Sequence, residues 1–304
     1  MSDALTLGIA GCGRIVQAGY VPALGRLPEL EVVAVADPVR DRRERVAAEI
    51  AGAPRPFASV GEMLEATRPE AVLVASPPSA HLEHATGAAD AGAVILVEKP
   101  PGRDLADAEA IARLRPRPWI GFNRRFSHLR SLAGRLPGEG TLDVSIAISY
   151  RRRSWRAHEV RTDALADLGP HAVDLARRIL EGLDSVRAAE IDFDRAELDV
   201  SGSRGRARII CAPNRPWTER IEVRSAGRRV AASLHGGLRS QLRLRRKGGE
   251  HPLTASLAAQ MGAFAAAAAG DADGLATAAD GVAVMRALEA VRRSASTGCR
   301  EVRI

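Results

Sequence analysis

The sequence predicts an α/β chain in which a doubly wound parallel sheet is followed by an α+β domain with a mostly antiparallel, open sheet. In the first part of the chain, short apolar runs alternate with segments that carry helix-capping signals, as in parallel sheets with crossover helices. Further along, longer segments alternate between apolar and polar residues, as in strands with one covered face. We therefore expect domains at residues 1–120 and 121–304.

The composition is that of an ordinary soluble globular protein, long enough for two domains. Of its 304 residues, 46% are hydrophobic and 27% charged, and the formal net charge is +7. Arginine is interleaved with acidic residues along most of the chain, and the basic runs at 151–153 and 242–247 lie in no nucleic-acid motif. We expect no nucleic-acid partner; an anionic small ligand would suit the same charge.

Neither the cysteines nor the apolar runs indicate secretion or a membrane. The three cysteines are widely spaced and odd in number, which argues against a disulfide framework and a metal site. The N-terminus has no basic region before an apolar core, and no apolar run approaches the roughly 20 residues that span a bilayer. We expect a cytoplasmic protein without a signal peptide or membrane segment.

The first apolar run, Leu5–Ala10, leads through a glycine turn into a helix that extends towards Leu24. In a strand–turn–helix unit, Gly11 permits the tight turn, and Gly13 lets the backbone approach a pyrophosphate at the helix N-terminus. Val16 occupies the third glycine position, so the helix–strand contact is looser than in the strict fingerprint. The segment predicts a dinucleotide-binding turn.

A second strand, Glu31–Ala36, ends at Asp37, a little over twenty residues beyond the turn. A carboxylate at this place can accept hydrogen bonds from an adenosine ribose and would repel a 2′-phosphate. Asp37 can also cap the helix that begins at Pro38, and the two roles are compatible. NAD is therefore preferred over NADP, although Arg40 and the arginines after it could shelter a phosphate.

Strands and helices continue to alternate up to residue 122. A capping box at Ser59 and Glu62 opens one helix, and Asp104 caps another that runs to Leu114. A helix after Ser76-Pro77-Pro78 carries His81 and His84; without a third ligand nearby, this histidine pair predicts no metal site. The predicted strands of this part are Ala71–Ala75, Ala93–Val97 and Trp119–Phe122.

Lys99 follows one of these strands and is conspicuous in the composition. Only two of the 44 basic residues are lysines, Lys99 and Lys247. Lysine is a compact point charge, which suits proton chemistry better than the always-charged arginine. Ligands of parallel sheets lie over the carboxyl ends of the strands, where Gly11, Asp37 and Ser76 are also expected. A cis peptide bond between Lys99 and Pro100 is predicted as a way to aim the lysine inward.

The second part of the chain combines strands with helices. The expected strands are Thr141–Arg152, Val186–Phe193, Ala207–Cys211, Thr218–Val223, Arg229–Leu234 and Arg239–Arg246. The expected helices are Ala164–Leu180, Thr254–Ala269 and Ala276–Ser294. In the first of these helices, Asp167 and His171 are four residues apart and share a face if both are helical. Because Pro170 suits only the first turn of a helix, Asp167 is expected to precede the helix and His171 to lie just inside it.

These motifs resemble those of the glucose–fructose oxidoreductase / inositol dehydrogenase / MocA family of NAD(P)-dependent oxidoreductases. They follow the family's order over nearly the whole chain, and Glu98-Lys99-Pro100 combined with Asp167-x-x-x-His171 is the most specific pair. The other matching segments are Gly8–Ile15, Val35–Asp37, Ser76-Pro77-Pro78 with His81, Gly121–Phe126, the continuation to Asp174, and Asp280-Gly281.

The resemblance implies a Rossmann-type domain that binds NAD, or alternatively NADP, and a second domain whose open sheet commonly mediates homo-oligomerisation. It implies hydride transfer between the nicotinamide and a sugar-, cyclitol- or related hydroxy/keto substrate. His171 would donate or accept the proton, Asp167 would orient it and the substrate, and Lys99 would bridge the nicotinamide ribose and the reacting oxygen. The expected cofactor contacts are Gly11, Cys12, Gly13, Arg14, Ile15, Asp37, Ser76, Pro77, His81, Glu98, Lys99 and Asn123.

One departure from the family concerns Thr162-Asp163, which stand where the family has a glycine pair. These side chains are expected to narrow the substrate pocket, and Asp163 adds a negative charge. Two alternatives to a dehydrogenase therefore stay open: a dinucleotide-binding sensor without turnover, and an NAD-dependent glycosidase. The candidates for substrate contact, or alternatively solvated strand-end residues, are Arg151, Arg152, Arg153, Trp155 and Arg156.

Overall fold

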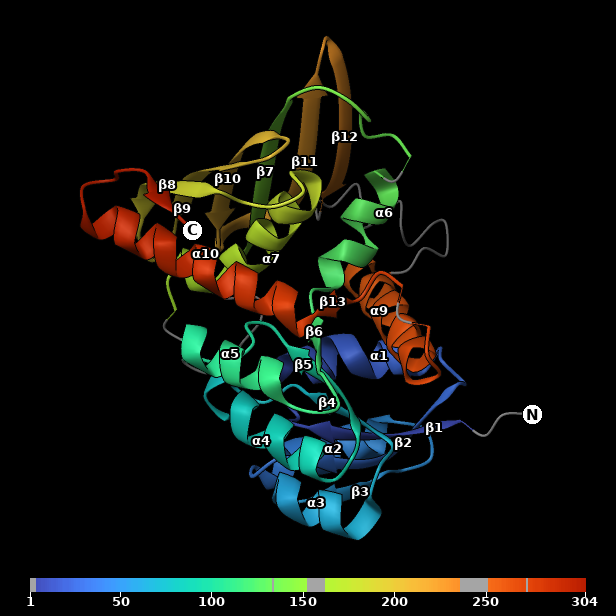
Figure 1. Ribbon diagram of the computed structural model, residues 1–304. Coiled ribbons are helices and arrows are strands. Elements are labelled where there is room, and N and C mark those ends of the chain that lie inside the picture. The colour runs from blue at the N-terminus through green and yellow to red at the C-terminus, as the bar shows by residue number, and fades with distance from the viewer. Residues whose placement is uncertain (1–3, 133, 152–161, 236–250, 272) are drawn as a thin grey trace. The chain divides into compact units, whose positions relative to one another are not determined.

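The computed structural model describes residues 4–132, 134–151, 162–235, 251–271 and 273–304 (Figure 1). The chain divides into two compact units, each described below by itself. The first combines Met1–Phe126 with Leu253–Val282, and the second combines Ser127–Pro252 with Ala283–Ile304. The predicted strand Arg239–Arg246 and the candidate substrate contacts Arg152, Arg153, Trp155 and Arg156 lie outside the described residues.

The first unit is built on a sheet whose strands run in the order β13-β6-β5-β4-β1-β2-β3. All neighbours pair in parallel except β13 with β6, so the predicted doubly wound parallel sheet is confirmed. The order reverses between β1 and β4, which is where open α/β sheets bind their ligands. The strands are β1 (Leu5–Ala10), β2 (Leu30–Ala36), β3 (Arg55–Phe57), β4 (Ala71–Val74), β5 (Val94–Glu98), β6 (Trp119–Gly121) and β13 (Ala276–Thr277).

Local signals in the sequence set the ends of several helices in this unit. The capping box is formed, since the Ser59 side chain accepts from Glu62 N and the Glu62 side chain accepts from Ser59 N. Asp104 caps α5 through the backbone N–H of Asp107. The helices are the π-helical turn η1 (Val16–Tyr20), α1 (Val21–Leu24), α2 (Arg40–Glu49), α3 (Val60–Thr67), α4 (Pro78–Asp90), α5 (Leu105–Arg113), the 3-10 turn η2 (Asn123–Phe126) and α9 (Pro252–Ala268).

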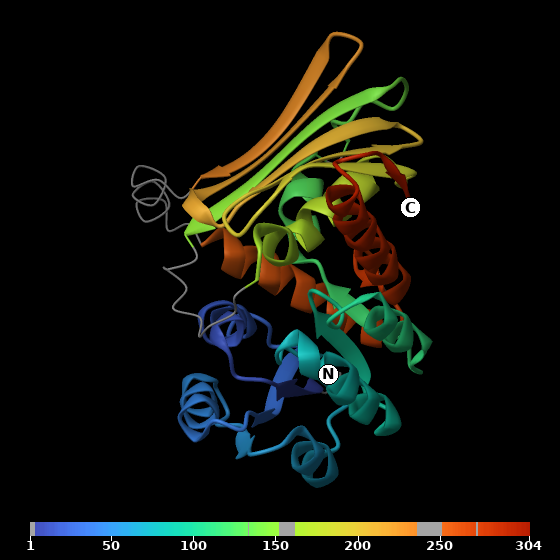
Figure 2. The same cartoon turned by 90° about the vertical axis from the view of Figure 1, so that its left-hand side faces the viewer.

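The second unit is built on a sheet in the order β12-β11-β7-β10-β9-β8-β14. Its pairs are antiparallel except β10 with β7, as expected for a mostly antiparallel sheet. Figure 2 shows helices lying under one face of this sheet. The elements are β7 (Leu142–Arg151), β8 (Ser185–Ile191), β9 (Ala196–Gly202), β10 (Gly205–Ala212), β11 (Asn214–Ser225), β12 (Arg228–His235), β14 (Val302–Arg303), α6 (His128–Leu132) and α7 (Ala164–Ile179).

The two faces of the second sheet differ in chemistry. On β7, the residues Val144, Ile146 and Ile148 are buried on the face towards α7, as their alternation predicts. The opposite face carries ion pairs between neighbouring strands, including Arg206 with Asp143 and Arg208 with Glu197. The alternation of apolar and polar residues along the strands therefore corresponds to one buried and one charged face of the sheet.

Two expectations about helices differ from the structure. Residues 253–282, which we expected in the second domain, cluster with the first unit, where α9 packs on the apolar core around β1 through Leu257, Met261 and Phe264. The closing helix α10 (Ala278–Ser296) begins in the first unit and continues into the second. The helix α7 starts at Ala164, as the predicted segment Ala164–Leu180 has it, but it includes Pro170, so Asp167 lies inside the helix and the expectation that it precedes the helix is wrong.

Candidate functional site

The glycine turn lies between the carboxyl ends of β1 and β4. Gly11 has a φ of +99°, and a Cβ on it would lie 2.6 Å from the backbone nitrogen of Ser76, so no other residue fits the turn. Around Gly13, by contrast, a Cβ would meet no atom within 4 Å. The backbone is helical from Arg14 onward, and Arg14 is exposed while Ile15 is half-buried. Open space before a helix N-terminus fits a pyrophosphate group.

Asp37 ties this turn to the end of β2. Its carboxylate is buried and accepts two backbone N–H groups, from Cys12 at 2.8 Å and from Val39 at 2.9 Å. Each carboxylate oxygen retains capacity for a further donor, such as a ribose hydroxyl. Burial, and then the Asp37 charge, raise the pKa of the Cys12 thiol to about 12, which leaves it a neutral, unreactive thiol near neutral pH.

His81 joins the loops that follow β4 and β5. It is almost fully buried, and its ring nitrogens lie 2.7 Å from the Ser76 carbonyl and 2.9 Å from the Pro100 carbonyl. Burial lowers the pKa of His81 despite these two carbonyls. His84 contacts the Ser76 hydroxyl at 2.9 Å. These bonds hold the two loops together, and the described residues contain no cluster of three or more metal-ligating side chains.

Lys99 extends from the carboxyl end of β5. The Lys99–Pro100 peptide bond is cis, which confirms the prediction. Lys99 is half-buried, and its backbone N–H donates to the Glu98 carboxyl at 2.9 Å. Glu98 is buried beneath it and accepts the hydroxyl of Tyr20 at 2.5 Å. The strand end therefore presents one lysine above a buried, hydrogen-bonded carboxyl.

Two further predicted residues of the first unit lie at the same edge of the sheet. Pro77 precedes the first residue of α4, where its fixed φ and missing N–H suit a helix start. Asn123 follows β6, is buried, and donates to the Ser256 hydroxyl at 2.9 Å. The predicted cofactor residues are thus gathered at the carboxyl ends of the parallel strands.

The helix α7 carries the predicted catalytic pair of the second unit. Asp167 and His171 are both helical and four residues apart, so they share a face of α7. Asp167 accepts the hydroxyl of Tyr150 at 2.6 Å, and His171 is buried. An imidazole beside an oriented carboxylate is suited to proton transfer.

Asp163 is the N-cap of α7. Its carboxylate accepts the backbone N–H of Ala166 at 2.8 Å and a bidentate pair of bonds from Arg292 at 2.8 and 3.1 Å. Partial burial acts to raise the pKa of Asp163, but the bonds from Arg292 and Ala166 outweigh it and lower the pKa. The Asp163 charge, which departs from the family pattern, is therefore balanced by Arg292 of the same unit.

We expect Asp163→Ala to lower the free energy of unfolding at pH 7 by about 1 kcal/mol, because it removes a helix cap. Since the folded-state pKa is lowered, this stabilisation is present above the ordinary carboxyl pKa and disappears as the pH falls through the folded value. Urea unfolding of both proteins from pH 3 to 7 measures it. Thr162→Ala is the neighbouring control, and a difference that stays constant over this range would contradict the role.

Both tyrosines were absent from the predicted site. The chain has only two, and each donates its hydroxyl to a carboxyl of the predicted site: Tyr20 to Glu98 and Tyr150 to Asp167. A signal was available in the composition, because tyrosine is as rare in this sequence as lysine, whose rarity made Lys99 conspicuous. Gln260 and Ser256 of α9 were also missed, since only the fold brings them to Tyr20 and Asn123.

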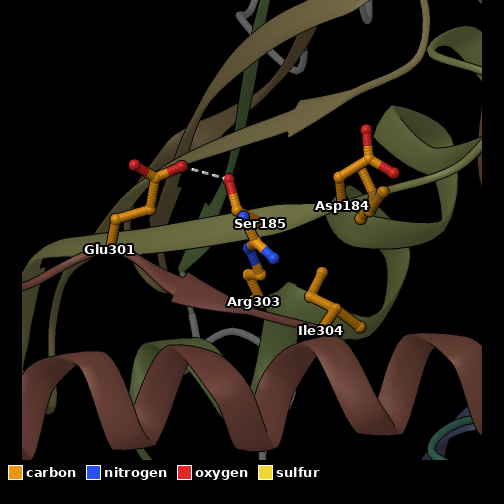
Figure 3. Close-up of a pocket in the computed structure, with 6 residues that line it drawn as sticks. Asp184, Ser185, Glu301, Arg303 and Ile304 are labelled. Carbon is orange, nitrogen blue, oxygen red and sulfur yellow. Dashed lines mark hydrogen bonds between the residues drawn. The ribbon is translucent and has the colours of Figure 1, made fainter.

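A surface pocket of the second unit lies away from all of these residues. It is formed at the sheet edge by β8 and β14, with Asp184, Ser185, Glu301 and Arg303 among its lining residues (Figure 3). None of the predicted site residues lines this pocket. It is not the candidate site.

Comparisons with known proteins show what the first unit is similar to. Residues 5–117 match the family model GFO_IDH_MocA, described as "Oxidoreductase family, NAD-binding Rossmann fold". The chain is 30% identical over 202 residues to glucose-6-phosphate 3-dehydrogenase of Bacillus subtilis, covering 60% of this chain and 56% of that protein. It is 38% identical over 144 residues to the myo-inositol dehydrogenase Hyg17 of Streptomyces leeuwenhoekii, covering 43% and 42%. The chain thus spans about half the length of these curated relatives.

The whole fold is also known from solved structures. One is scyllo-inositol dehydrogenase from Lactobacillus casei with bound NAD(H) and scyllo-inositol, which matches with a TM-score of 0.79 and 17% identity, covering 99% of both chains. At this identity the likeness concerns the fold. No helix among the described residues has the length and apolar character needed to cross a membrane.

Proposed function

We propose that this chain, whose residues 5–117 match the GFO/IDH/MocA family of NAD-binding oxidoreductases, is a dehydrogenase that acts on the CH–OH group of a sugar- or cyclitol-like substrate. The observation that carries the proposal is the gathering of Gly11, Asp37 and Lys99 at one edge of the parallel sheet. The printed names of the relatives, dehydrogenases of a sugar phosphate and of inositols, support this substrate class.

The proposed roles follow from the chemistry of each group. In the oxidation direction, neutral His171 accepts the hydroxyl proton of the substrate, and Asp167, held by Tyr150, orients the imidazole. The Lys99 ammonium stabilises the negative charge that develops on the oxygen. The nicotinamide, when bound, accepts the hydride. Gly13 and the helix N-terminus bind its pyrophosphate, and Asp37 binds a ribose diol.

We propose NAD rather than NADP as the cofactor. The buried Asp37 carboxylate would repel a 2′-phosphate at the same place. The nearby arginines are partly engaged: Arg40 pairs with Glu44 at 2.6 Å, and Arg43 donates to the carbonyls of Asp37 and Pro38 at 3.2 Å. The ion pair with Glu44 supports NAD as the cofactor, since it directs Arg40 to another carboxylate, while Arg43 stays beside Asp37 through the two carbonyls.

Asp37→Asn should therefore move the cofactor preference towards NADP. The amide keeps an acceptor for Cys12 N but removes the charge, and we expect NAD affinity to fall about 10-fold or more while NADP affinity rises. Titrating NADH and NADPH fluorescence measures both constants. Asp41→Asn, which removes a nearby exposed carboxylate at the start of α2, is the matched control. An unchanged ratio of the two affinities in Asp37→Asn would refute the proposed ribose contact.

We also propose that the charged face of the second sheet mediates homo-oligomerisation. Hydrogen bonds from Arg229, then Arg220 and Arg224, lower the pKa of Glu222 to about 2, so its charge persists under all ordinary conditions. Ala147 and Ile210, which pair between β7 and β10, are half-buried on this face and supply a small apolar centre. Light scattering should show an oligomer that Ile210→Glu weakens; a wild-type monomer at every concentration would exclude this interface.

Turnover assays test the proposal against its two alternatives. Nicotinamide absorbance is followed with sugars, inositols, sugar phosphates and nucleotide sugars in both directions. Sustained reduction of NAD by at least one compound supports the dehydrogenase. Tight NADH binding without turnover on any compound indicates a sensor. Release of product from a glycoside without net change in NADH indicates a glycosidase.

A further inference from the structure

A chain of buried hydrogen bonds lies beneath Lys99. The hydroxyl of Tyr20 donates to the Glu98 carboxyl at 2.5 Å, and the side-chain N–H of Gln260 donates to the Tyr20 oxygen at 3.0 Å. The other oxygen of Glu98 accepts the backbone N–H of Lys99 at 2.9 Å. Tyr20 and Gln260 are fully buried, and Glu98 is 7% exposed. These residues come from η1, β5 and α9 of the first unit.

This arrangement of hydrogen bonds suits an ionised Glu98. The Tyr20 hydroxyl and the Lys99 N–H donate to the carboxylate, and Gln260 donates to the Tyr20 oxygen. The arrangement leaves one polar atom unused: the carbonyl oxygen Oε1 of Gln260 is buried and has no hydrogen-bond partner among the described residues. A half-turn of the amide would exchange its oxygen and nitrogen and place an acceptor beside Tyr20. A protonated Glu98 could then donate to the Tyr20 oxygen, and Tyr20 to Gln260.

We infer that Glu98, Tyr20 and Gln260 form a reversible hydrogen-bond chain that lets Glu98 gain or lose a proton beneath Lys99 without leaving a buried hydroxyl proton unpaired. A buried donor without an acceptor costs free energy. If the hydrogen bonds could not reverse, this cost would hold Glu98 in one protonation state. Tyr20 and Gln260 are positioning residues, because they act through Glu98.

The charges around Glu98 are compatible with both its protonated and its ionised state. Burial raises the pKa of Glu98, and the hydrogen bond from Tyr20, the Lys99 charge and, least of these, the Arg124 charge offset part of this effect. Burial and the neighbouring carboxyl also raise the pKa of Tyr20, so its hydroxyl keeps its proton. The mobile proton therefore belongs to Glu98, and the phenol only relays the hydrogen bond.

The consequence for the reaction rests on the proposed role of Lys99. An ionised Glu98 places a negative charge within electrostatic reach of the lysine, and a neutral Glu98 removes it. The state of the chain thus changes the electrostatic field at the group that stabilises the reacting oxygen. The proton itself can be followed without substrate, so a failure of this inference is distinguishable from a failure of the proposed function.

Infrared titration of the full-length protein tests the chain directly. We expect a carbonyl band of a buried protonated carboxyl that disappears in Glu98→Gln and persists in Glu219→Gln, which removes a buried glutamate of the second unit. The pH midpoint at which this band disappears should lie above the ordinary pKa range of a glutamate side chain. Tyr20→Phe removes the donor to the carboxylate and also the acceptor of the protonated carboxyl. Because the bond to the charged state is the stronger of the two, the midpoint should still rise, by up to about one pH unit.

Gln260→Met gives the decisive result, because it removes the acceptor that the reversed chain needs. A reversible chain predicts that the midpoint falls by about one pH unit, since neutral Glu98 would leave the Tyr20 proton unpaired. A chain fixed in one direction predicts the opposite shift, because the phenol would lose the donor that supports it. Gln260→Leu serves the same purpose if the methionine variant fails to fold. A raised or unchanged midpoint in the variant that folds overturns the inference.

A kinetic readout follows if the dehydrogenase is active. In Tyr20→Phe the limb of the kcat profile that follows Glu98 should move with the infrared midpoint, while the KM for NAD stays within about two-fold, a span worth under 1 kcal/mol. A uniform loss of kcat at all pH values with an unmoved limb would assign the residue a purely structural role.

Discussion

Lys99→Met is expected to lower kcat by about 10²–10³ while the protein still folds and still binds NADH. The methionine keeps the length and much of the apolar stem of lysine but removes the ammonium that we propose to stabilise the reacting oxygen. The Glu98 hydrogen bond to this residue uses its backbone N–H and persists in the variant. Steady-state kinetics with the compound that gives turnover, together with NADH fluorescence, measures the effect.

Lys99→Arg is the matched control for charge. The guanidinium keeps the positive charge but spreads it over a planar fork, so we expect partial rescue and a smaller loss than in the methionine variant. If Lys99→Met turned over at the wild-type rate, the lysine would have no part in the reaction.

His171→Asn should lower kcat by about 10²–10⁴ and remove the limb of the pH profile that reports the base. Asparagine retains a polar side chain at the buried position but cannot accept a proton near neutral pH. His251→Asn, which alters a histidine of the same unit stacked on Trp217, is the control and should leave the profile unchanged. A full bell-shaped profile in His171→Asn would assign the proton transfer to another group.

Tyr150→Phe separates orientation from proton transfer. Removing its hydroxyl deletes the 2.6 Å bond to Asp167, and we expect a loss of kcat about ten-fold smaller than that of His171→Asn, with the limb of the profile retained but shifted. A loss equal to that of His171→Asn would make the tyrosine itself a participant.

The sheet of the first unit follows from local sequence signals. The apolar runs, the glycine turn and the caps at Ser59 and Asp104 each act over a few residues, so the parallel sheet and the edge that carries Gly11 and Lys99 could be inferred from them. The short strand β3 was missed because its three residues include a proline and are largely exposed.

The placement of Asp167 shows two local rules in conflict. The start of α7 at Ala164 is as expected, but Pro170 suggested that Asp167 precedes the helix, whereas the structure uses Asp163 as the cap and accommodates the proline inside the helix. The bidentate bond from Arg292, 129 residues away, secures that cap. A partner so distant in sequence leaves no local signal.

The hydrogen bonds around the site were beyond sequence reasoning for the same reason. Gln260 reaches Tyr20 across 240 residues, and Tyr20 reaches Glu98 across 78. The polar strand β9 was missed because its acidic residues, Glu197 and Asp199, depend on arginines of other strands to be accommodated in a sheet. Residue identity pointed to Lys99 and His171, but their supporting partners are a property of the fold.

Direct hydride transfer between the substrate and the nicotinamide is tested by an isotope experiment. A substrate that gives turnover is labelled with deuterium at the carbinol carbon and oxidised by the full-length protein with NAD. The account predicts that the label appears in the reduced nicotinamide, that kcat falls with a primary isotope effect, and that Lys99→Met and His171→Asn abolish the transfer. Label released to solvent, or turnover undiminished in both variants, would contradict it.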